Sequence, residues 1–103
     1  MTVREELERS LAGVLGVVRR PSRWGQYHAY YFGDREIAHF HGDGRMDVRL
    51  TKEYIKELKA RGELDARVKT RGPAAEWAAV SISDPRDVPL ALQLVEDAVR
   101  ANA

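Results

Sequence analysis

Residues 26–50, QYHAYYFGDREIAHFHGDGRMDVRL, predict three β-strands joined by two short turns. The strands are rich in aromatic and aliphatic residues, which favour extended structure: YHAYYF (27–32), REIAHFH (35–41) and RMDVRL (45–50). Between them lie Gly33-Asp34 and Gly42-Asp43-Gly44, and such Gly/Asp segments are typical of hairpin turns. This stretch therefore predicts an antiparallel meander to which the rest of the chain is added.

The segment before the meander predicts one helix and a connector. Thr2 and Glu5 have the spacing of a capping box, and apolar residues then recur at helical intervals, which predicts a helix over 2–15. Residues 19–25, RRPSRWG, are expected to be an irregular basic connector because a proline and a glycine interrupt them.

The segment after the meander predicts a helix and a second hairpin. Thr51 is the expected cap of a helix over about 52–61, and Gly62 is its expected stop. ARVKTR (66–71) and EWAAVSIS (76–83) are then expected to pair as strands around Gly72-Pro73.

The final element is a helix capped by Asp84, with Pro85 in its first turn. Its expected buried stripe consists of Val88, Ala91, Leu92, Val95 and Val99. The element order αβββαββα predicts a single α+β domain over residues 1–103. We expect a two-layer sandwich in which an antiparallel sheet of about five strands carries helices on one face.

Turn length decides which side chains share a face of this sheet. If Gly33-Asp34 is a two-residue turn, His28 pairs with His39; if Asp43-Gly44 is another, His39 pairs with Val48. The helix-covered face is then expected to carry His28, Tyr30, Phe32, Ile37, His39, His41, Met46, Val48 and Leu50, joined by Val68, Ala78, Val80 and Ile82. The opposite face is expected to carry Tyr27, Ala29, Tyr31, Glu36, Ala38, Phe40, Asp47, Arg49 and Trp77.

Composition excludes several classes of protein. The chain is 44% hydrophobic and 32% charged with a net charge of +1, which is typical of a folded domain. It has no cysteine, so disulfides, zinc–thiolate sites and thiol nucleophiles are excluded. No apolar run is long enough for a membrane span and no signal peptide is recognisable, so we expect a cytoplasmic protein. The scarcity of Asn, Gln and Cys favours a thermophilic or GC-rich bacterial source.

The histidines are the first candidate site. In His39-Phe40-His41 the two imidazoles are two residues apart on a strand and point the same way, and His28 is the expected third member. Metal binding, general acid–base chemistry and half-buried structural histidines are the three interpretations. We expect no tightly held metal and no cofactor, because only two imidazoles are secure ligands.

The opposite face is the second candidate site, because it combines aromatic rings with cations. Residues 45–71 contain nine Lys/Arg and five Asp/Glu, whereas residues 72–103 contain two and five. A basic aromatic sheet face can bind nucleic acid, bind a planar anion, form a homodimer or simply face solvent. The residues concerned are Tyr27, Tyr31, Phe40, Arg49, Arg67, Lys69, Arg71 and Trp77.

Residues spread over about 15–100 resemble the luciferase-domain family, small domains of bacteria and fungi named after fungal luciferases. The matching positions are Glu36, His39, His41, Asp47, Gly62 and Trp77. The fungal namesakes oxidise a polyphenolic pyrone with molecular oxygen and emit light; the resemblance implies candidate positions here rather than luminescence.

The function that these observations favour is the binding of a small planar or anionic molecule. His39 and His41 are the candidate catalytic residues; His28, Asp47, Arg49 and Trp77 are the candidate ligand-binding residues. Nucleic-acid binding and a homo-oligomeric interaction module without catalysis are the alternatives, and whether the chain is an enzyme is left open.

Overall fold

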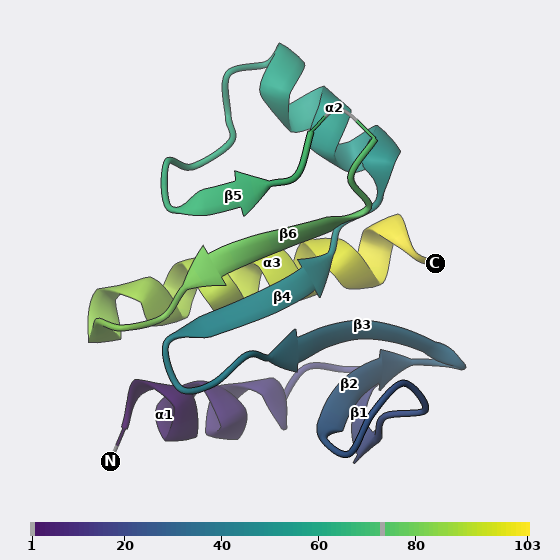
Figure 1. Ribbon diagram of the computed structural model, residues 1–103, viewed down its shortest axis with the longest axis vertical. Coiled ribbons are helices and arrows are strands. Elements are labelled where there is room, and N and C mark those ends of the chain that lie inside the picture. The colour runs from purple at the N-terminus through teal and green to yellow at the C-terminus, as the bar shows by residue number, and fades with distance from the viewer. Residues whose placement is uncertain (1, 73) are drawn as a thin grey trace.

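One antiparallel sheet of six strands, in the order β1-β2-β3-β4-β6-β5, forms the first layer of the protein (Figure 1). The computed structural model describes residues 2–72 and 74–103. Its elements are α1 (Val3–Leu11), β1 (Val17–Pro21), β2 (His28–Phe32), β3 (Arg35–Phe40), β4 (Arg45–Arg49), α2 (Lys52–Ala60), β5 (Val68–Thr70), β6 (Trp77–Ser81), the 3₁₀ helix η1 (Pro85–Asp87) and α3 (Val88–Ala101). The predicted α+β class and the order of the predicted elements are confirmed.

The helices cover one face of the sheet, as expected. α3 crosses behind β4 and β6 in Figure 1, and it contacts α1, β3 and β4. The core between the layers draws on all three helices and on five strands: Leu7, Leu11, Tyr30, Ile37, Ala38, Met46, Val48, Leu50, Ile55, Val68, Ala78, Val80, Ile82, Val88, Ala91, Leu94, Val95 and Ala98. No helix within residues 2–72 and 74–103 has both the length and the apolar character needed to cross a membrane.

The helix boundaries follow the predicted caps. Thr2 and Glu5 form the capping box of α1, and the Thr51 hydroxyl accepts from the backbone N–H of Tyr54 at the start of α2. Gly62 ends α2 with a φ of 67°, a conformation that glycine adopts at low cost. The first helix is shorter than predicted, because it ends at Leu11; Leu15, expected in its apolar stripe, is 94% exposed.

A sixth strand, β1, occupies part of the segment that was expected to be a connector. Val17 pairs with Phe32 and Pro21 pairs with His28, so β1 forms an edge of the sheet. A proline is tolerated at the end of an edge strand because its missing N–H breaks no interior ladder. The sheet therefore has six strands, one more than the approximate number expected.

The predicted register of the meander holds at the first turn, where Phe32 pairs with Arg35, and is wrong beyond it on both sides of β3. Tyr31 pairs with Glu36 and Tyr30 pairs with Ala38, which leaves Ile37 as the extra residue of a β-bulge. The second turn has three residues rather than two, because the N–H of His41 donates to the carbonyl of Arg45.

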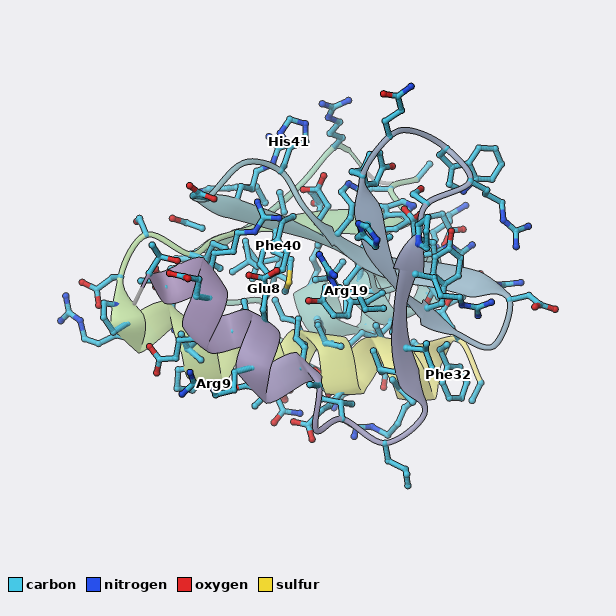
Figure 2. The ribbon with its side chains drawn as sticks, turned by 90° about the horizontal axis from the view of Figure 1, so that it is seen from below. Glu8, Arg9, Arg19, Phe32, Phe40 and His41 are labelled. Atoms are coloured by element: carbon cyan, nitrogen blue, oxygen red, sulfur yellow. The ribbon has the colours of Figure 1, made fainter. Side chains whose placement is uncertain are left out.

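These two shifts reverse the faces of the residues at the end of β3. Ala38 pairs with Val48 and joins the core, whereas His39 pairs with Asp47 and lies on the open face. Figure 2 shows Phe40 on the α1 side of the sheet and His41 projecting from the other side. The predicted pairings of His39 with His28 and with Val48 are therefore wrong.

The second hairpin places its apolar side chains on the predicted face of the sheet. Val68, Ala78, Val80 and Ile82 are all buried in the core. Val68 pairs with Val80, and β6 continues the sheet by pairing with β4. Of the predicted turn residues, Pro73 lies outside the described part of the chain.

Candidate functional site

The register brings most of the candidate residues onto the open face of the sheet. Asp47 lies opposite His39 on neighbouring strands, and Arg49 lies opposite Trp77. The expectation that His39 lies on the face opposite to Trp77 and Arg49 is thus wrong, because it assumed a two-residue second turn and a β2–β3 ladder without a bulge. One surface now holds an imidazole, a carboxylate, a guanidinium and an indole, which can act on one molecule.

His39 lies between two carboxylates. Its Nδ1 is 3.2 Å from Oε2 of Glu36, and its Nε2 is 3.1 Å from Oδ2 of Asp47. An imidazolium can donate to both carboxylates, whereas a neutral imidazole has one N–H and can donate to only one of them. In this arrangement both ring nitrogens are engaged, so His39 reaches a ligand only if one carboxylate gives way.

Glu36 is the more firmly held of the two carboxylates. The Ser22 hydroxyl donates to its Oε1 at 2.6 Å, and the Tyr31 hydroxyl does so at 3.3 Å. The backbone N–H of Arg23 in turn donates to the Tyr31 hydroxyl at 3.2 Å. With a side chain 5% exposed, Glu36 is a fixed anchor for His39.

Asp47 is more accessible and has a different partner. Its side chain is 18% exposed, and Oδ2 accepts from Nη2 of Arg45 at 3.4 Å. The buried Nε of Arg45 lies 3.1 Å from Oδ1 of Asp47 without hydrogen-bond geometry, and no other partner satisfies it. The Nε2 side of His39 is therefore the side that a ligand can open more easily.

Two aromatic rings flank the imidazole. The centroid of the His39 ring is 5.4 Å from that of Tyr27 and 5.2 Å from that of Trp77, both with tilted planes. The position of Tyr27 depends on Gly25, where an added Cβ would lie 2.5 Å from Cε1 of the Tyr27 ring. The loop between β1 and β2 thus places a tyrosine beside the histidine.

Two hollows open on this face, and His39 and Trp77 line both. The first, named here the aromatic hollow, has a volume of about 860 Å³ and is lined by Arg23, Trp24, Tyr27, Phe32, Asp34, Arg35, Glu36, His39, Arg49, Trp77, Asn102 and Ala103. The second, named the basic hollow, has a volume of about 630 Å³ and is lined by His39, His41, Arg45, Asp47, Lys69, Arg71, Ala74, Ala75, Glu76, Trp77, Ala78 and Ala79.

Arg49 lies at the wall of the aromatic hollow and is held from the C-terminal end of the chain. Its guanidinium donates to Oδ1 of Asn102, and its carbonyl accepts from Nδ2 of Asn102 at 2.8 Å. Nη2 of Arg49 is 3.8 Å from Oε2 of Glu76, a distance too long for a hydrogen bond. These contacts orient the guanidinium and leave donors for an anion.

The other two histidines are separated from this arrangement. His28 is exposed at the start of β2, opposite Pro21, and it lines neither hollow. His41 is exposed beyond the end of β3 and lines only the basic hollow. The described residues contain no group of three or more His, Asp or Glu side chains placed to hold one metal ion.

Sequence reasoning singled out Asp47 but did not predict that Glu36 and Ser22 help to hold His39 in place. Ser22 falls in the segment expected to be a connector, and Glu36 was placed on the open face without a partner. One local signal was present: Ile37 and Ala38 are consecutive apolar residues, which breaks the alternation of a regular strand and is consistent with a bulge.

Comparison with known families identifies the family of the chain. A family model described as the Luciferase domain matches residues 34–98, which run from the turn before β3 into α3. The match includes Glu36, His39, Asp47, Arg49 and Trp77, and the chain belongs to this family. No curated protein and no solved structure matches the chain.

Proposed function

We propose that this protein binds a small planar anion in the aromatic hollow. The observation that carries the proposal is the row of rings formed by Tyr27, His39 and Trp77, with centroid separations of 5.4 and 5.2 Å, beside a hollow of about 860 Å³. Trp24 stands at the same hollow and is 74% exposed, so its indole adds apolar surface that the core does not use. Flat aromatic walls favour a flat ligand.

The charge of the ligand is inferred from the cations of the same hollow. Arg23, Arg35 and Arg49 line it, and a guanidinium donates strongly to a carboxylate or phosphate. Arg49 is the best placed of the three, because Asn102 already orients it.

His39 supplies the polar group at the boundary of the two hollows. Glu36 fixes the ring through Nδ1, so a ligand that displaces Asp47 meets Nε2 in a set orientation. In this proposal His39 hydrogen-bonds the ligand or exchanges a proton with it, and His41 is a second candidate for the same role from the basic hollow.

A small ligand is favoured over nucleic acid by the carboxylates on the same surface. Asp34 and Glu36 line the aromatic hollow, and Asp47 and Glu76 line the basic hollow. A polyanion that covered both hollows would meet these charges, whereas a small anion can contact the cations alone.

The test uses 2-naphthoate as a planar anion and cyclohexanecarboxylate as a non-planar anion of equal charge. We expect 2-naphthoate to bind about fivefold more tightly, since stacking adds to the shared ion pair. Amide chemical shifts are expected to move around His39 and Trp77. Trp77→Leu is expected to remove the preference, whereas Tyr54→Leu, on α2 in the helix layer, is expected to keep it. Equal affinity for both probes, or shifts confined to residues near Tyr54, would refute the proposal.

A further inference from the structure

The basic hollow has a charge excess that no part of the site described so far uses. Three cations line it, Arg45, Lys69 and Arg71, against two carboxylates. Asp47 is engaged by Arg45 and by His39. Glu76 accepts from the backbone N–H of Lys52 at 2.9 Å and lies 3.8 Å from Nη2 of Arg49. Both carboxylates therefore have partners of their own.

Lys69 and Arg71 remain without a carboxylate. Within residues 2–72 and 74–103, neither side chain takes part in an ion pair, and both are exposed. Arg67, on the same segment, contrasts with them, because Asp65 and Asp87 both pair with it. The hydrogen bonds that Arg67 donates to these two aspartates hold its pKa above the usual range. Lys69 and Arg71 have no such partner in the described part of the chain and are free to meet an external anion.

The floor of the basic hollow leaves room for such an anion. Lys69 pairs across the strands with Ala79, which itself pairs with Asp47. The side chain of Ala79 is a single methyl group, so it leaves space between Lys69 and the contact of His39 with Asp47. A group that enters here can approach Lys69 and Nε2 of His39 from the same side.

We propose that the ligand carries a second anionic group, which Lys69 and Arg71 bind in the basic hollow while the planar part lies in the aromatic hollow. This inference deepens the proposed function and rests on it. His39 and Trp77 line both hollows, so one molecule can span them. The ligand class is a flat molecule with negative groups at opposite ends.

The register sets the size of that molecule. Arg49 lies opposite Trp77, whereas Lys69 lies opposite Ala79, two residues further along β6. The backbones at Arg49 and Lys69 are therefore about 10 Å apart across the strands and about 7 Å apart along them. Two long side chains that reach inward over this separation match a dianion built on about two fused rings.

The matched probes are 2,6-naphthalenedicarboxylate and 2-naphthoate, which share the ring and differ by one carboxylate. At low ionic strength we expect the dianion to bind about fivefold more tightly. The paired substitution Lys69→Gln with Arg71→Gln is expected to abolish this advantage and to leave the affinity for 2-naphthoate unchanged. The control pair, Lys52→Gln with Lys56→Gln on α2, is expected to keep the advantage.

The outcomes separate the two proposals. If 2-naphthoate binds and the second carboxylate adds nothing, the basic hollow holds no anion and the present inference is wrong. If neither probe binds, the proposed function itself is wrong. A ten-nucleotide oligothymidylate is the third probe. If it binds more tightly than the dianion, and its affinity falls steeply as the salt concentration rises, Lys69 and Arg71 bind nucleic acid and the inference is overturned.

Discussion

The two faces of the same sheet obey different physical rules. On β4, Met46 and Val48 point towards the helices and are fully buried, whereas Asp47 and Arg49 point the other way and are only partly covered. The helix-covered face is held by packing of apolar side chains, and the open face by hydrogen bonds and ion pairs. This contrast teaches that residues one position apart on a strand can have separate roles, the first in the apolar core and the second, in the function proposed here, in ligand binding.

The largest effect is expected on the covered face. Met46→Ala removes a fully buried side chain, and we expect the free energy of unfolding to fall by about 2–5 kcal/mol, because a cavity is left in the core. Urea denaturation measures the loss. The affinity of the folded variant for 2-naphthoate is expected to stay unchanged. A loss of stability below about 1 kcal/mol would break the contrast between the faces.

An intermediate effect is expected at a buried charged residue of the open face. Glu36→Gln removes the charge that faces Nδ1 of His39 and disturbs the contacts from Ser22 and Tyr31. We expect a loss of about 1–3 kcal/mol in the free energy of unfolding and a shifted NMR signal of the His39 ring. Glu53→Gln, at an exposed position of α2, is the control and should change neither. A His39 signal that does not move would show that Glu36 does not orient the ring.

The smallest effect is expected at an exposed ion pair away from both hollows. Hydrogen bonds from Arg67 lower the pKa of Asp65, so Asp65 stabilises the fold above the pKa it has in the unfolded chain, and this contribution is lost as the pH falls through its lower folded pKa. Asp65→Asn should therefore be slightly less stable than the parent at neutral pH, and the two should converge below about pH 3.9. Denaturation over a pH series checks this; a gap that widens in acid would contradict it.

The sequence predicted the covered face better than the open one. The alternation of apolar residues along β4 and β6 correctly predicted which residues are buried: Met46, Val48, Ala78 and Val80. An apolar side chain turned towards solvent would lose the free energy of burial, and nothing else would offset that loss. The capping residues Thr2 and Thr51 were also found, since a cap depends on local spacing alone.

The open face was harder to predict because it depends on turn length and on a bulge. A turn that is one residue longer moves His39 to the other side of the sheet, and composition alone does not distinguish two turn residues from three in HGDG. The strand β1 was missed for a related reason: its pairing partner β2 decides its structure, whereas its own sequence is short and contains Pro21.

The bulge at Ile37 has a consequence for the comparison of sequences. It lets Glu36 and His39 share a face although they are three positions apart, a spacing that puts residues on opposite faces of a regular strand. A relative that lacks residue 37 would carry the same acid and imidazole on the same face with one residue between them. An alignment that penalises a gap inside a strand would score such a chain as lacking the pair, although its carboxylate and imidazole would share a face as they do here.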